Sequence, residues 1–61
     1  MKPTGTILAK LSTARARRTL FLEYAQDRLL ERDYHGVADA AMDLREIQHE
    51  IDILEWVLEE A

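Results

Sequence analysis

The sequence predicts an all-α protein, an antiparallel two-helix hairpin that assembles into a homo-oligomeric bundle of four or more helices. Apolar residues in the second half recur at alternating intervals of three and four, the spacing of a helix that packs along one seam. No segment shows the two-residue alternation of a half-buried strand. With 61 residues and no cysteine, the chain has a small core and no disulfide, so association is the remaining common source of stability.

Residues 1–6 contain the only proline and one of the two glycines, which indicates a short flexible arm before the first helix. We expect that helix over residues 7–32, because Ile7, Leu8 and Leu11 already follow helical spacing. Its seam toward the second helix would carry two successive arginine layers where leucine is usual. The expected seam residues are Leu8, Leu11, Arg15, Arg18, Leu22, Ala25, Leu29 and Arg32.

The second helix is expected over residues 34–60. Asp33 is a suitable N-cap for it, with Tyr34, His35 and Gly36 forming its first turn or part of a tight connection. Its expected seam is unbroken and consists of Val37, Ala40, Leu44, Ile47, Ile51, Leu54, Leu58 and Ala61. A turn between the two helices lets them pack against each other, so we expect one domain over residues 1–61.

A second apolar stripe is expected on the back of each helix, although one hairpin can bury only one face of each. Trp56, Ile53 and Met42 cluster by helical spacing, which scattered surface residues would not do. We therefore predict contact with other copies, a dimeric four-helix bundle being the simplest form. The predicted interface residues are Leu20, Tyr24, Met42, Ile53 and Trp56.

Charge is strongly divided along the chain. Residues 1–22 carry five basic residues and no acid, whereas residues 23–61 carry three arginines and all twelve acids, which gives the net charge of −4. In an antiparallel hairpin, the basic start of the first helix lies beside the acidic end of the second. This arrangement can neutralise itself, or it can leave the basic segment available to an anionic partner.

The two seam arginines are the leading candidate site, because a guanidinium in an apolar seam must find an anion or reach water. The expected register places Arg18 opposite Ile51 and Arg15 opposite Leu54, with Glu50 and Glu55 at the border of the seam. In one interpretation, these glutamates pair with the arginines. In the other, copies of Arg15 and Arg18 converge in the oligomer and bind a nucleotide-like phosphate ligand, supported by Lys10 and Arg17.

A metal site is the alternative hypothesis. Glu46 and His49 have the Glu-x-x-His spacing that supplies two ligands per helix in helical di-iron proteins, and the register puts Glu23 opposite Glu46. The segment from Glu46 to Val57 also resembles the corresponding helix of encapsulated ferritins, which implies iron bound by Glu23, Glu46 and His49 at a dimer interface. The simpler interpretation, which we favour, is a surface glutamate and a histidine packed near Trp56, with no cofactor.

Residues 33–46 resemble small, mostly uncharacterised proteins of phages and prophages, which commonly act by stoichiometric binding in the host cell. The resemblance implies a counter-defence or regulatory protein that binds a nucleotide signal or inhibits a host protein. In architecture alone, the chain also resembles the plasmid copy-control protein, a short helical hairpin that dimerises and binds paired RNA loops. The acidic second helix argues against a broad nucleic-acid surface here.

Catalysis and membrane insertion are not expected. Ser12 and the threonines have no histidine partner at a helical offset, and a thin hairpin offers no water-excluding pocket, so we predict a non-enzymatic protein. The first apolar run, residues 7–9, is too short for a membrane span or a signal-peptide core. We therefore expect a protein of the host-cell cytoplasm.

Overall fold

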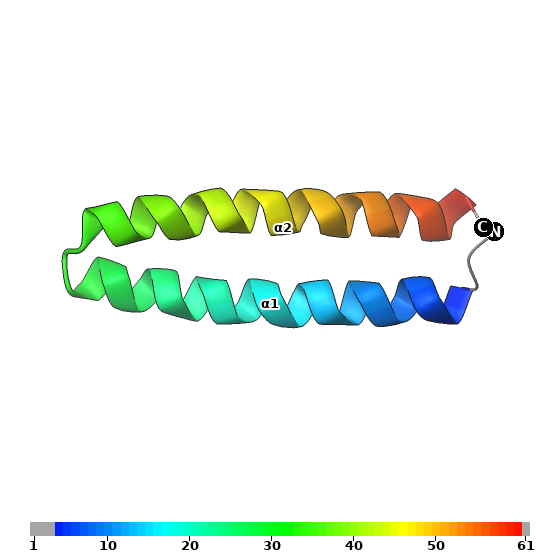
Figure 1. The fold of residues 1–61 in the computed structure, drawn as a ribbon, viewed down its shortest axis with the longest axis horizontal. Helices are drawn as coiled ribbons and strands as arrows, with labels where there is room; N and C mark the ends of the chain where they lie inside the picture. Colours follow the sequence, from blue (N-terminus) through cyan, green and yellow to red (C-terminus); the bar gives the residue numbers. More distant parts are fainter. Residues whose placement is uncertain (1–3, 61) are drawn as a thin grey trace.

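The computed structural model describes residues 4–60, which form two antiparallel helices, α1 (Thr4–Leu30) and α2 (Tyr34–Glu60). Figure 1 shows them side by side along their whole length, with one tight connection at one end. No strand occurs among the described residues. The predicted all-α antiparallel hairpin is therefore confirmed.

The helix bounds differ slightly from those expected. Thr4, Gly5 and Thr6, expected in the arm, already belong to α1, while residues 1–3 lie outside the described part of the chain. The helix thus begins at the residue that follows the only proline of the sequence. At its other end α1 stops at Leu30, two residues earlier than expected.

The end of α1 is set by a left-handed residue. Arg32 has a φ of 60°. Its amide donates to the carbonyl of Leu29 at 3.0 Å, and the amide of Asp33 donates to the carbonyl of Arg28 at 2.8 Å. These two hydrogen bonds form a Schellman motif, which satisfies carbonyls that the helix end would otherwise leave unpaired.

Asp33 caps the start of α2, as the sequence predicts. Its Oδ1 accepts a hydrogen bond from the amide of Gly36 at 3.0 Å, and its backbone carbonyl accepts one from the amide of Val37 at 3.0 Å. Gly36 is buried against this cap, and a Cβ there would lie 2.5 Å from Oδ2 of Asp33 and 3.1 Å from Cδ of Arg28. The connection therefore requires both an N-cap carboxylate and a glycine.

The seam of α2 is confirmed. Ala40, Ile47 and Ile51 are buried, and Ile51 is the largest side chain that is almost wholly enclosed. Val37, Leu44, Leu54 and Leu58 are half-buried beside them, and Ala61 lies outside the described residues.

The seam expected for α1 is wrong at Leu8, Arg15, Leu22 and Leu29. Arg32, its last expected residue, is exposed and lies beyond the end of the helix. Ile7, Leu11 and Ala14 are buried, whereas Leu8 and Leu29 are more than half exposed. The observed seam consists of Ile7, Leu11, Ala14, Arg18, Phe21, Ala25 and Arg28. It shares Leu11, Arg18 and Ala25 with the expected one but replaces Leu8, Arg15, Leu22 and Leu29 by the residues just before them. This orientation buries Ile7 and places Arg15 at the edge of the seam. The two adjacent arginine layers are thus replaced by Arg18 alone, and Arg28 occupies a separate layer near the connection.

The hairpin has a small core and an elongated shape. Only six apolar residues are buried among those described. Its extents are 45 × 14 × 13 Å and its radius of gyration is 14.1 Å, against about 10.5 Å for a compact chain of this length. Within residues 4–60, neither helix is long and apolar enough to cross a membrane.

We predict that Arg32→Gly stabilises the hairpin. The left-handed conformation costs a residue with a Cβ about 1–2 kcal/mol, and glycine adopts it freely but loses more entropy on folding, so the free energy of unfolding should rise by about 0.5–1 kcal/mol. Urea unfolding followed by circular dichroism at one fixed protein concentration measures this change. Arg32→Ala is the control and should leave stability nearly unchanged. A glycine variant no more stable than the alanine variant would contradict the prediction.

Gly36→Ala should destabilise the hairpin. The new methyl displaces the carboxylate of Asp33 from its capping position, which should lower the free energy of unfolding by about 1 kcal/mol despite the better helix propensity of alanine. Gly5→Ala is the matched control, because a Cβ built there meets no atom within 4 Å apart from its chain neighbours and the adjacent backbone of its own helix. That variant should be as stable as the parent or slightly more so in the same urea experiment. Equal stabilisation by both substitutions would rule out the close approach at Gly36.

Candidate functional site

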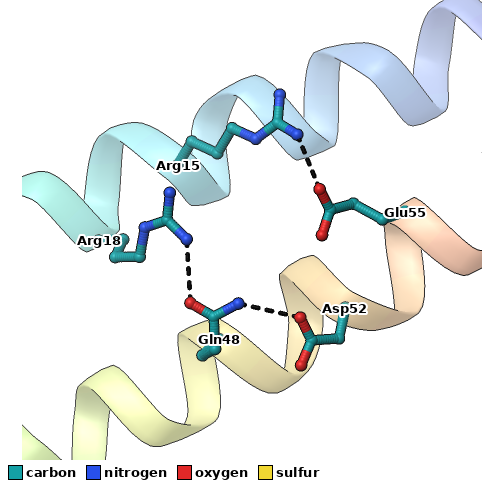
Figure 2. Close-up of polar contacts among 5 residues, drawn as sticks. All are labelled: Arg15, Arg18, Gln48, Asp52 and Glu55. Atoms are coloured by element: carbon teal, nitrogen blue, oxygen red, sulfur yellow. Dashed lines mark hydrogen bonds and ion pairs between the residues drawn. The ribbon is translucent and has the colours of Figure 1, made fainter.

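Arg15 extends from α1 across the hairpin to α2. Its Nη2 lies 3.0 Å from Oε2 of Glu55, in one hydrogen-bonded ion pair (Figure 2). Both side chains are about half exposed, so solvent screens the pair and its contribution to stability is at most about 0.5 kcal/mol. For Arg15, the interpretation in which a glutamate at the border of the seam pairs with the arginine is confirmed, and the pair lies at the edge of the seam.

Arg18 lies in the seam and is half-buried. Its Nη1 donates to Oε1 of Gln48 at 2.9 Å, and Nε2 of Gln48 donates to Oδ1 of Asp52 at 2.9 Å. Figure 2 shows this chain beside the Arg15–Glu55 pair, on the same side of the hairpin. The positive charge of Arg18 therefore contacts a neutral amide, and the nearest link to a carboxylate passes through Gln48.

For Arg18, the interpretation in which Glu50 and Glu55 pair with the arginines is wrong, since its side-chain hydrogen bond goes to Gln48 and Glu50 pairs with Arg17. Oε2 of Glu50 lies 3.8 Å from Nη1 of Arg17, a loose pair in which both side chains are about half exposed. Arg15 and Arg17 differ by about 200° around α1, so their acidic partners flank the seam on opposite sides. Arg18 reaches toward the side of Arg15, where α2 presents Gln48 and Glu55.

The four basic residues proposed to bind an anion do not share one surface. Lys10 and Arg17 line an open groove together with Glu50 and Thr13, and neither Arg15 nor Arg18 lines it. The hydroxyl of Thr13 donates to the carbonyl of Ala9 at 3.1 Å within α1, so it is already engaged. Arg15 and Arg18 thus form one candidate anion site, and Lys10 and Arg17 lie on a separate groove that contains a carboxylate.

The residues of the metal hypothesis are not brought together within one chain. Glu46 and His49 line an open groove on α2 with Arg45 and Asp52, and Glu23 does not line it. Across residues 4–60, no three histidine, aspartate or glutamate side chains lie close enough together to hold a metal ion. A site formed by Glu23, Glu46 and His49 would therefore need a second copy of the chain.

All five predicted interface residues are exposed. The exposed fractions are 65% for Leu20, 49% for Tyr24, 67% for Met42, 49% for Ile53 and 60% for Trp56. Three further leucines, which the sequence analysis assigned to the seam, are also exposed: Leu8 at 52%, Leu22 at 46% and Leu29 at 54%. Their assignment followed from the seam error. Their spacing does not separate them from the seam, because the row that begins at Ile7 and the row that begins at Leu8 both repeat every seven residues.

Arg28 has a structural role that the sequence analysis missed. Its guanidinium contacts Glu31 at 2.7 Å and Asp33 at 3.7 Å, and it lies 5.5 Å from the ring centroid of Tyr24. These contacts tie the end of α1 to the capping aspartate of α2. Its Nε is buried and has no hydrogen-bond partner among the described residues.

No protein-family model, curated protein or solved structure matches this chain. Two features of the hairpin bear on its function. Many apolar side chains are exposed, and the half-buried Arg18 has a neutral amide as its direct partner.

Proposed function

We propose that this chain is a non-enzymatic binding protein whose hairpins associate with one another into a helical bundle. The observation that carries the proposal is the extent of exposed apolar surface. Ten large apolar side chains are exposed by 46% to 81%, whereas six apolar residues are buried. Exposed apolar side chains that share one side of a helix, as Leu8, Leu22 and Leu29 do on α1, are typical of a surface that another protein covers. The exposed residues are Leu8, Leu20, Leu22, Tyr24, Leu29, Leu30, Tyr34, Met42, Ile53 and Trp56.

Self-association also supplies the stability that a single hairpin lacks. One layer of two helices buries one face of each, and a domain of this size without disulfides is marginal. Stacking two hairpins gives a four-helix bundle, in which each helix gains a second neighbour. A closed two-fold dimer is the commonest arrangement of identical chains.

The proposal predicts an assembly whose folding depends on protein concentration. Light scattering coupled to gel filtration, together with native mass spectrometry, should give a mass at least twice the 7.1 kDa of one chain. Dilution should lower both the mass and the helical circular dichroism, because dissociated hairpins lose the apolar contacts that stabilise them. A fully helical 7.1 kDa species at all concentrations would refute self-association.

A nucleotide-like anion is the ligand that Arg15 and Arg18 favour. Planar guanidiniums bind phosphate through two parallel hydrogen bonds, and each arginine makes one side-chain hydrogen bond in the hairpin. Arg18 would exchange a neutral amide for a phosphate, which strengthens its electrostatic contact. The resemblance of residues 33–46 to small phage proteins supports a counter-defence or regulatory setting for such binding, in the host-cell cytoplasm.

Isothermal titration with a panel of linear and cyclic nucleotides tests ligand capture. We expect binding to the parent protein, with affinity lowered at least tenfold in Arg18→Ala and further in the double variant Arg15→Ala/Arg18→Ala, because charge-assisted contacts to phosphate are lost. Arg45→Ala is the control, since it removes the same charge from an exposed position on α2. Absence of binding by the parent, or equal loss in the control, would refute the site.

A further inference from the structure

We infer that the second copy docks on the side of the hairpin that carries Leu8, Leu22 and Leu29, here called the leucine row. This inference rests on the self-association proposed above and assigns it a surface. The assigned surface differs from the one predicted from the sequence, which comprises Leu20, Tyr24, Met42, Ile53 and Trp56.

The leucine row lies directly beside the seam. Leu8, Leu22 and Leu29 each follow a seam residue, so they lie about 100° around α1 from Ile7, Phe21 and Arg28. Their exposed fractions of 46% to 54% show that the hairpin itself covers about half of each side chain. The remaining half is an apolar strip that continues the core outward.

Arg15 identifies the side on which the row lies. It is seven residues from both Leu8 and Leu22 and thus occupies the same row, and its guanidinium reaches Glu55 on α2 (Figure 2). Gln48 is seven residues before Glu55 and lies on the same side. Tyr24 is seven residues after Arg17, which pairs with Glu50 on the opposite side.

The apolar stripe of α1 is too wide for one partner helix. Ile7 with Leu8, and Phe21 with Leu22, place large apolar residues in neighbouring rows, and Leu11 lies between these two pairs along the helix. A seam between two helices needs only two such rows. A third row is the pattern of a helix that contacts two neighbours, as in a four-helix bundle.

The order of residues in this row suits a second copy. From the N-terminal end, the row reads Leu8, Arg15, Leu22, Leu29 at equal intervals of seven. Laid antiparallel on itself, it sets Leu8 against Leu29 at both ends and Arg15 against Leu22 on both sides of the centre. Each leucine then meets either a leucine or the aliphatic stem of an arginine. The row is thus complementary to itself, as the surface of a two-fold interface must be.

Charge does not oppose this pairing. The two copies of Arg15 would approach near the centre, but each already has a carboxylate of its own chain at 3.0 Å. The chain Arg18–Gln48–Asp52 lies on the same side and would become more enclosed. Because its members hydrogen-bond to one another, it can form a polar layer that disfavours slipped registers, as a buried polar residue does in coiled coils.

Two triple variants test the surface. The row variant replaces each of Leu8, Leu22 and Leu29 by Gln. The control variant replaces each of Leu20, Ile53 and Trp56 by Gln. All six side chains are exposed in the single hairpin, so the two triples remove comparable surface residues. Light scattering over a concentration series should show the dissociation constant raised on the order of a thousandfold or more in the row variant and little changed in the control.

Disulfide formation tests the antiparallel pairing without removing the interface. The chain has no cysteine, so Leu8→Cys and Leu29→Cys can each be introduced as a unique thiol. An equimolar mixture of the two single variants should give the mixed disulfide dimer under mild oxidation, whereas each variant alone should give little. Because each variant has a single thiol, every disulfide formed must join two chains.

The outcomes distinguish the inference from the proposed function. A monomeric parent would refute self-association itself. An oligomeric parent whose row variant remains associated, while the control variant dissociates, would overturn the leucine row and leave self-association standing. If both variants dissociate or the row variant is unfolded, the disulfide decides: a mixed disulfide dimer supports the row, and equal crosslinking in all three samples refutes it.

Discussion

The packing of α1 against α2 along one seam is the constraint on which the rest of the structure depends. Leu11, Ala14, Ile47 and Ile51 form the buried cluster, with Phe21, Leu54 and Leu58 packed against it. Two helices in one layer have one such contact, so each keeps most of its circumference in solvent. The exposed leucines, the polar contacts at the seam edges and the need for a tight connection all follow from this limit.

The connection and the seam stabilise the hairpin more than the ion pairs do. Arg15–Glu55 and Arg17–Glu50 are about half exposed and lie on either side of the seam, where salt screens them. Their value is in orientation, since basic residues of α1 meet acidic residues of α2 only when the helices run antiparallel in this register. The Schellman motif, the cap at Asp33 and the close approach at Gly36 enforce the same register from the other end of the hairpin.

The helices, the cap at Asp33 and the seam of α2 could be predicted from the sequence, because each has one dominant local signal. The seam of α1 has two neighbouring signals. Leu8, Leu22 and Leu29 are as apolar as Ile7 and Phe21, and periodicity alone does not say which row faces α2. Packing decides it, since the chosen row buries Ala14 and lets Arg15 reach solvent. The same ambiguity explains the error at Arg18, whose partner depends on a rotation of α1 that sequence spacing does not reveal.

The correction of the seam changes what the arginines can do. With Arg15 at the edge, Arg18 is the member of this pair that lies in the seam, and its acceptor is Oε1 of Gln48. A phosphate that captured Arg18 would leave that oxygen without its donor, which costs about 1–3 kcal/mol where no water can replace it. In a single hairpin, water can replace the donor; under a second copy on the leucine row, it would be excluded. Ligand capture and self-association through that row would therefore be coupled, and by linkage each would weaken the other unless the anion itself bridged the two copies.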